Sequence, residues 1–348
     1  MEKSYLGRNS NLELYRIVMM LLIVASHFAT PICKYFSTAG LHGIQLYQIV
    51  FSSGGKIGIN SFVLLSSYFM CSQDIKISKF IKLIAQVYFY SIVVSLSSIA
   101  LLNPEVSIKN MFQNIIFPFA YNDIDHFATP FIFFYLLTPF LRKIVENIDK
   151  KTHGILIIVC LTCYVLYSFP FLSVRLDAVA WFCVLFFIAS YIKFYFKLSD
   201  DSKIGVIFWT TFVAVIIILC LLLTFNLPAL RLIGNANSIF ALIVSVISFL
   251  YFLNLKLGNN KLINTIASTT FGVFLIHTNY FLRHWLWYDF VDSEKWFFAD
   301  GLSGIIAPLS YVLLIFVVCS LLDFVRKAII EKYYLRVIFR IFRISNNE

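Results

Sequence analysis

Two side chains in the first apolar segment of the sequence could do chemistry together: Arg16 and His27, in YRIVMMLLIVASHFA. They are 11 residues apart, and 11 steps of 100° put both on one face of an α-helix, about 16 Å apart along its axis. A charged group inside hydrocarbon is costly, so its presence points to a function. An arginine fork binds phosphate, and a histidine accepts protons near neutral pH. The pair therefore fits a long ligand whose phosphate contacts Arg16 and whose reactive end reaches His27.

Both side chains also have a structural explanation. Arg16 could extend its guanidinium to the membrane interface, and His27 could hydrogen-bond a neighbouring helix. Three lysines after the second apolar segment, Lys76, Lys79 and Lys82, recur every third residue and are expected to complete a phosphate pocket with Arg16. Lysines at a cytoplasmic helix end also set topology, so this second explanation stays open for them.

These residues lie in a chain that is too apolar for an ordinary soluble fold. Of its 348 residues, 60% are hydrophobic and 13% are charged, whereas soluble domains average about 45–50% apolar and about 25% charged residues. A globule of this size cannot bury that much apolar surface. The composition therefore excludes a soluble enzyme, a disordered chain and a disulfide-stapled domain, and it predicts an all-α polytopic membrane protein.

Apolar runs of suitable length predict about ten transmembrane helices. They run near 12–32, 57–72, 83–102, 126–141, 154–171, 178–195, 204–225, 238–255, 263–282 and 303–323. Twenty of the 28 Lys and Arg residues then fall on the side of the termini, seven fall on the other side, and Arg16 lies within the first span. The positive-inside rule therefore predicts that both termini are cytoplasmic. Topology thus explains most of the net charge of +10 without a nucleic-acid partner.

Two parts of the chain are expected: a membrane-embedded domain over 1–323 and a basic tail over 324–348. In the tail, Arg and Lys residues alternate with apolar residues. This pattern is typical of an amphipathic helix that lies on the cytoplasmic leaflet and is attracted to anionic lipid.

Four segments, in this order, resemble the acyltransferase type 3 family of integral membrane enzymes. The first is the Arg-x10-His signature formed by Arg16 and His27. The others are GKIGINSFVLLSSYFM (55–70), HFATPFIFFYLLTPFLRK (126–143) and ASTTFGVFLIHTN (267–279). The chain departs from the family pattern at Ser67, where glycine is frequent, and at Ala128, where tryptophan is frequent. Neither departure touches the Arg-His pair.

The resemblance implies a membrane O-acetyltransferase of a bacterial plasma membrane. Such an enzyme moves an acetyl group from cytoplasmic acetyl-CoA to a hydroxyl of a cell-surface or exported polysaccharide, or of its lipid-linked precursor. By this similarity, Arg16 would bind the CoA phosphates, and His27 would be the catalytic base or a transient acyl carrier. The expected partners are acetyl-CoA, the glycan acceptor and membrane lipid, without nucleic acid.

Acyl transfer needs more than a base, because charge that develops on oxygen needs a donor and the acceptor needs positioning. Asn60, Ser66 and Tyr68 in the second apolar segment are candidates for this support. Ser66 and Tyr68 diverge by about 200° on a helix, so both can face one site only if the helix is broken. Three glycines would permit such a break: Gly54, Gly55 and Gly58. Interhelical hydrogen bonding by small polar residues is the alternative role.

Two further histidines, His126 and His277, are expected at the outer side, where they could face the glycan acceptor. Helix-end hydrogen bonding is the alternative for both. His126 stands near Asp123 and Asp125, but this spacing fits no standard zinc site, so no metal is expected. A transporter or flippase for a polar or lipid-linked solute is the alternative function, because ionisable residues near the midplane and broken helices fit it too.

Overall fold

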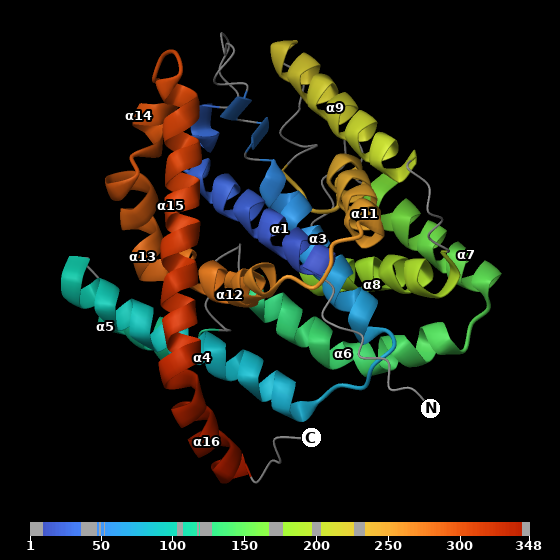
Figure 1. The fold of residues 1–348 in the computed structure, drawn as a ribbon, viewed down its shortest axis with the longest axis horizontal. Coiled ribbons are helices and arrows are strands. Elements are labelled where there is room, and N and C mark those ends of the chain that lie inside the picture. The colour runs from blue at the N-terminus through green and yellow to red at the C-terminus, as the bar shows by residue number, and fades with distance from the viewer. Residues whose placement is uncertain are drawn as a thin grey trace.

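The computed structural model describes residues 10–35, 47–48, 50–51, 53–102, 107–116, 118, 127–166, 177–196, 203–225 and 234–342. Every regular element in this part of the chain is a helix, which confirms the all-α class there (Figure 1). The first half contains α1 (Ser10–Phe28), η1 (Cys33–Tyr35), α3 (Gly54–Met70), α4 (Ile77–Leu102), α5 (Ile108–Ile116), α6 (Ala128–Glu146), α7 (Lys150–Leu161) and η2 (Thr162–Leu166). The second half contains α8 (Ala178–Tyr195), α9 (Lys203–Thr224), α11 (Ile239–Asn254), α12 (Lys261–His277), α13 (Tyr280–His284), η3 (Trp285–Phe290), α14 (Ser293–Phe297), α15 (Ser303–Val325), η4 (Arg326–Ile330) and α16 (Glu331–Phe342).

Each of the ten expected membrane spans overlaps a helix of the described chain: α1, α3, α4, α6, α7 with η2, α8, α9, α11, α12 and α15. Six helical segments of the described chain are long and apolar enough to cross a bilayer: α1, α4, α6, α8, α9 and the stretch Ser303–Phe342. Because these segments are helical and apolar, the chain is a helical membrane protein. The count of ten spans and the cytoplasmic position of both termini stay predictions.

Large apolar side chains on the outside of the helix bundle agree with a lipid environment. On α9, Val206 is 63% exposed and Trp209 is 56% exposed. On α15, Leu313 and Leu321 are more than half exposed. A soluble monomer rarely shows such contiguous apolar surface, whereas lipid tails cover it without cost.

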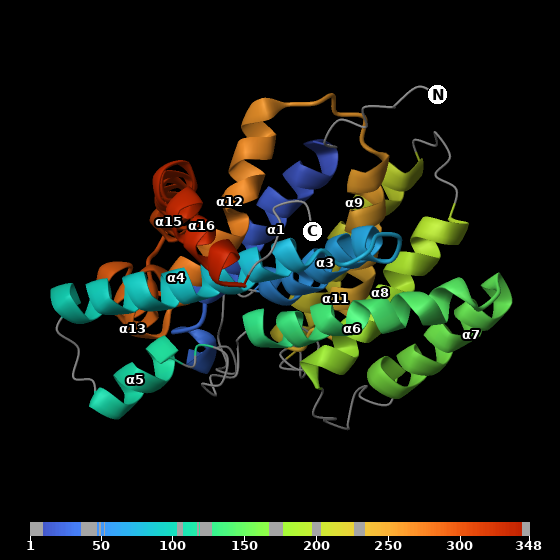
Figure 2. The same cartoon turned by 90° about the horizontal axis from the view of Figure 1, so that it is seen from below.

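Helix α1 lies at the centre of the bundle, where it packs against α3, α11, α12 and α15 (Figures 1 and 2). Its contact with α3 depends on glycines that face it. A Cβ atom on Gly55 would lie 2.1 Å from Oγ of Ser26, and one on Gly58 would lie 2.6 Å from Cγ1 of Ile23. The glycines therefore allow close helix packing. The break that these glycines would permit in the second span is absent: α3 is one continuous helix that begins at Gly54.

Buried hydrogen bonds fix the first half of α1 in this position. The Tyr15 hydroxyl donates to Oγ of Ser61 on α3 at 2.7 Å and lies 2.9 Å from Oγ of Ser248 on α11. Asn11 donates to the carbonyl of Phe252 at 2.7 Å. The Ser10 hydroxyl donates to Oδ1 of Asn264 on α12 at 2.9 Å. Polar contacts in a low-dielectric interior are costly to break. These hydrogen bonds therefore hold α1, which carries Arg16 and His27, in a fixed position against α3, α11 and α12.

The basic tail is helical where the structure describes it, up to Phe342. Helix α15 continues through η4 into α16, and α16 lies beside α4 (Figure 2). Its position on the surface of the cytoplasmic leaflet stays a prediction.

Candidate active site

Helix α1 runs unbroken from Ser10 to Phe28, so Arg16 and His27 share one of its faces, as their spacing predicts. The Arg16 side chain is 26% exposed. Its Nη1 donates to Oε2 of Glu13 at 3.0 Å. A ligand anion that binds Arg16 therefore competes with this carboxylate, or joins it on another edge of the guanidinium, which has five donors.

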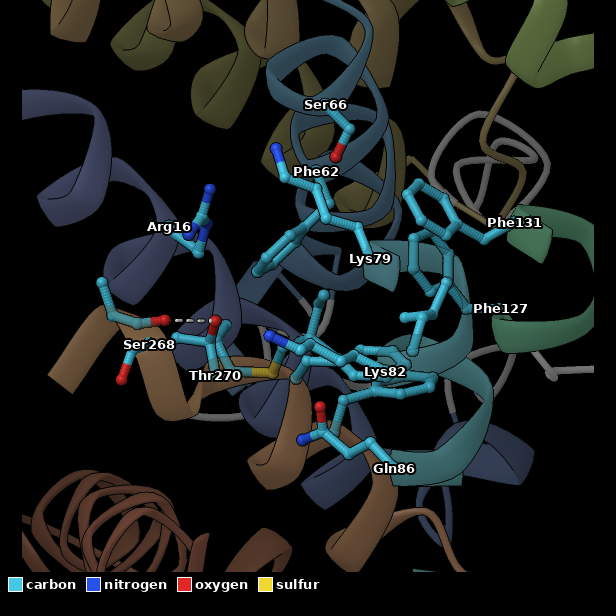
Figure 3. A pocket seen from close by; sticks show the side chains of 16 residues that line it. Arg16, Phe62, Ser66, Lys79, Lys82, Gln86, Phe127, Phe131, Ser268 and Thr270 are labelled. Atoms are coloured by element: carbon cyan, nitrogen blue, oxygen red, sulfur yellow. Dashed lines mark hydrogen bonds between the residues drawn. The ribbon is translucent and has the colours of Figure 1, made fainter. Parts of the chain in front are cut away.

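A cavity of about 330 Å³ opens beside Arg16 (Figure 3). We call it the donor cavity. Arg16 on α1 and two lysines on α4, Lys79 and Lys82, bring three cations to its wall, and no acidic residue is among the described residues that line it. Four polar residues join them: Ser66, Gln86, Ser268 and Thr270. The rest of the wall is apolar: Met20, Ile23, Phe62, Leu83, Phe127, Phe131, Ala267, Phe271 and Phe274.

The composition of this wall suits a ligand with a polyanionic head and an apolar arm. Three cations around one space attract an anion with several charges. Hydroxyl and amide groups among them can donate hydrogen bonds to its oxygens. The apolar part of the cavity wall suits an uncharged part of the same ligand. Of the three lysines expected here, Lys79 and Lys82 line the cavity, whereas Lys76 does not.

The apolar side of the donor cavity leads toward the histidines along two helices. On α1, Met20 and Ile23 line the cavity, and His27 follows Ile23 by four residues. On α12, Phe274 lines the cavity, and His277 follows it by three residues. Residues three and four apart share a helix face. Both faces therefore continue from the cavity to a point where the two histidines meet.

His27 and His277 lie edge to face, with ring centroids 5.1 Å apart. His277 is fully buried, and its Nδ1 lies 2.6 Å from the carbonyl oxygen of Val273. Because a carbonyl only accepts, Nδ1 carries the proton and donates it, and Nε2 is left as an acceptor. This Nε2 has no hydrogen-bond partner among the described residues. His277 thus offers a lone pair beside His27.

Trp287 in η3 completes this end of the site. Its side chain is 3% exposed, and its ring stands edge-on to His277 with centroids 6.2 Å apart. Its indole Nε1 also lacks a hydrogen-bond partner in the described part of the chain. Native proteins rarely leave buried polar groups unpaired, and active sites are where exceptions occur. The site therefore holds one unused acceptor on His277, whose ring contacts His27, and one unused donor on Trp287, whose ring contacts His277.

A second, smaller cavity of about 60 Å³ lies past Phe274, next to the end of α12 that carries His277. Phe274 lines this cavity as well as the donor cavity. Seven residues give the second cavity hydroxyl and amide groups: Tyr90, Ser91, Ser95, Asn114, Thr278, Asn279 and Tyr280. Asn279 donates to Oγ of Ser95 at 3.2 Å. No side chain among these is an acid or a strong base, so the lining suits a neutral, hydroxylated molecule.

The three residues of the second span that were expected to support the site lie in different places in the structure. Ser66 lines the donor cavity, but Tyr68 does not, because the helix is unbroken and the two side chains diverge. Instead, the Lys193 ammonium lies 4.5 Å from the centre of the Tyr68 ring. Asn60 is fully buried, where it donates to the carbonyl of Ala236 at 2.7 Å and accepts from Nε1 of Trp181 at 2.9 Å. His126 lies outside the described residues.

Sequence reasoning missed several residues that the structure brings to the site, among them Gln86 and Trp287. Gln86 follows Lys82 by four residues and Lys79 by seven, so the helical period that groups the lysines could have included it. Trp287 gave no such signal. It lies in an aromatic stretch whose pattern equally predicts an interfacial belt, and only its burial in the structure distinguishes it from exposed neighbours such as Tyr288.

The comparison with protein families gives one match. A model described as an acyltransferase domain matches residues 9–324, nearly the whole chain. The matched range includes α1 with both of its candidate residues, α4 and α12. Searches of the curated proteins and of the solved structures found no match.

Proposed function

Because the chain belongs to the acyltransferase type 3 family, we propose that it is an O-acetyltransferase that uses acetyl-CoA and a glycan hydroxyl. Family membership makes the chain a membrane acyltransferase. The donor, the acceptor and the location in a bacterial plasma membrane are the proposal. One observation carries it: the faces of α1 and α12 connect a cavity with three cations to His27 and the buried His277, whose rings are in contact.

The donor cavity would hold CoA by its two chemical halves. The phosphates of the nucleotide end would bind Arg16, Lys79 and Lys82, where cations already face one space. The uncharged pantetheine arm would follow the apolar wall past Ile23 and Phe274. About 16 Å of helix separates Arg16 from His27, which suits a thioester at the end of a long arm. The expected topology puts the mouth of this cavity on the cytoplasmic side, where acetyl-CoA is made.

At the histidines, His27 would act as the general base. Its ring nitrogen takes the proton of the acceptor hydroxyl while that oxygen attacks the thioester carbonyl carbon. The carbonyl oxygen becomes negative, and the unused N–H of Trp287 would donate to it. The C–S bond then breaks, and the leaving thiolate takes the proton back from His27. His277, whose ring packs edge to face against the His27 ring, would hold that imidazole in place.

A two-step route uses the same residues. His27 could first attack the thioester itself, release the CoA thiol and carry the acetyl group until the acceptor hydroxyl takes it. The second cavity, which shares Phe274 with the donor cavity and has a lining of hydroxyl and amide groups, would then admit the hydroxyl group of the acceptor. The acyl donor would then enter through the donor cavity and the acceptor through the second cavity, and the two would meet at the histidines.

The proposal can be tested with sealed membrane vesicles that contain the protein and its glycan. Acetyl-CoA labelled in the acetyl group is supplied on the side of the donor cavity, and the glycan is then isolated. We expect label in the glycan as an ester that mild alkali releases. CoA labelled in the adenine ring serves as the control and should not enter the vesicles.

Two results would contradict the proposal. Label that crosses the membrane on a small solute, without ester formation, would favour the transporter alternative. An acyl group that appears on an amine, in a bond that resists mild alkali, would keep the acyltransferase but refute the hydroxyl acceptor.

A further inference from the structure

The C-terminal residues from Asp323 to Phe339 pack behind the donor cavity without lining it. We propose that five of them form a clasp that positions the wall of the donor cavity: Asp323, Arg326, Lys327, Leu335 and Phe339. They act on acyl-CoA binding through residues of α4 and α12, and they do not touch the ligand. This inference rests on the proposed function, because it takes the ligand of the cavity to be a CoA thioester.

The first contact of the clasp is with Gln86, a lining residue on α4. Oδ1 of Asp323 accepts from Nε2 of Gln86 at 3.2 Å and from the hydroxyl of Tyr90 at 2.7 Å. It also accepts from Nε of Arg326 at 2.8 Å. Asp323 is fully buried and Arg326 is 2% exposed. The carboxylate thus ties two turns of α4 to α15 from the back of the cavity.

The second contact is with α12, the opposite wall. A Cβ atom on Gly272 would lie 2.3 Å from the Asp323 carboxylate, so only glycine lets this side chain reach α12. Nζ of Lys327 donates to the carbonyl of Ser268, which lines the cavity, and lies 3.3 Å from Oδ2 of Asp323. One cluster of charges therefore holds lining residues on α4 and on α12 at once.

The third contact comes from α16. Leu335 and Phe339 are buried against Ala85, the neighbour of Gln86. The ammonium of Lys82, one of the three cations of the cavity, lies 5.9 Å from the centre of the Phe339 ring. Apolar packing and a cation–π contact together restrict how α4 presents its lysines.

The charges of the clasp make it cooperative. Asp323 and Glu331 compensate Arg326 and Lys327, and Arg326 donates to Glu331 at 2.7 Å. Removal of one partner from a buried ionic cluster leaves another charge unpaired in a low-dielectric site. The cluster is therefore held together as a whole or lost as a whole. Since recognition of an anion needs cations held in fixed positions, loss of the clasp should weaken donor binding more than it slows the chemical step.

The test uses the full-length protein in detergent and two variants that leave the cavity lining unchanged, Phe339→Ala and Lys327→Met. Val337→Ala is the matched control, because Val337 lies on α16 and is 57% exposed. We expect each test variant to raise the KM for acetyl-CoA about fivefold or more, because misplaced binding groups weaken ligand binding. The kcat should stay within about twofold of the wild-type value. Phe339→Leu should recover most of the affinity. Unchanged KM in both test variants, or equal losses in the control, would overturn the clasp.

A second measurement keeps the clasp separate from the proposed function. If wild-type protein does not bind CoA, the proposed donor is wrong, and the clasp is then judged by backbone hydrogen exchange. Faster exchange of α4 amides around 81–86 in Phe339→Ala, with the rest of the bundle unchanged, supports the clasp. Unchanged exchange there contradicts it.

Discussion

The two ends of the face shared by Arg16 and His27 differ in charge, burial and satisfaction of hydrogen bonds. At the Arg16 end, three cations line an open cavity and their side chains are partly exposed. At the His27 end, His277 and Trp287 are buried, and each has a polar atom without a partner. One helix thus joins an open end lined by cations to an end where His27 lies against buried aromatic side chains.

This difference separates two tasks that a single polar site would perform poorly. Partly exposed cations bind an anion at modest cost and release it again, because water screens them. Unpaired donors and acceptors in a dry site strengthen the charge separation of a transition state. We therefore expect substitutions at the Arg16 end to change binding and substitutions at the His27 end to change the rate.

The largest effect is expected from His27→Ala. Loss of a general base or acyl carrier should lower kcat by about a thousandfold, within the range known for acid–base groups, while the KM for acetyl-CoA changes little. Steady-state kinetics with labelled acetyl-CoA measure both. His284→Ala is the matched control, because its side chain is 74% exposed. A variant that binds the donor poorly but turns over normally would reverse the roles of the two ends.

A smaller loss is expected from Trp287→Phe, which removes only the unpaired indole N–H. If this N–H stabilises the negative oxygen, kcat should fall about a hundredfold, as for the removal of one oxyanion donor. Trp296→Phe is an informative control, because its Nε1 already donates to the carbonyl of Val291 at 3.0 Å. The control should lower thermal stability without lowering kcat. Equal kcat in both variants would show that the donor is elsewhere.

How much of this site the sequence could predict depends on the separation of the residues. The alignment of Arg16 with His27 follows from helix geometry alone, and the structure has it. Helix geometry also explains why Ser66 lines a cavity and Tyr68 does not. The glycines of α3 allow close packing and leave the helix unbroken, so the two side chains point in different directions. The meeting of His27 with His277 joins residues 250 positions apart. No local pattern encodes it, because tertiary packing brings α1 and α12 together.

At the Arg16 end, Arg16→Gln should weaken donor binding about tenfold, which is what loss of one charge-assisted contact gives. The effect should shrink as salt rises, because the cations are partly exposed. Titration of CoA into purified protein at low and high ionic strength measures it. Arg142→Gln is the control, since Arg142 pairs with Asp74 and Glu146 outside the cavity. A fall in kcat without a change in affinity would contradict the division between the ends.

The smallest effect concerns an ion pair beyond the His27 end, outside the expected spans. Lys34 lies 2.5 Å from Glu294, and Tyr35 donates to the same carboxylate at 2.9 Å. These contacts, led by Lys34, hold the pKa of Glu294 below its ordinary value. A lowered pKa means that the pair stabilises the fold at neutral pH and that this contribution disappears as the pH falls through the range below 4.5.

Glu294→Gln should therefore lower the thermal midpoint at pH 7 by only about 1 °C, because exposed ion pairs contribute little. It should also flatten the acid side of the stability curve. Differential scanning of wild type and variant from pH 3.5 to pH 7 measures both. A loss of many degrees at pH 7 would mean that the ion pair between Lys34 and Glu294 stabilises the structure around His277 and Trp287. A small loss would leave that role to the buried packing around Trp287 and His277.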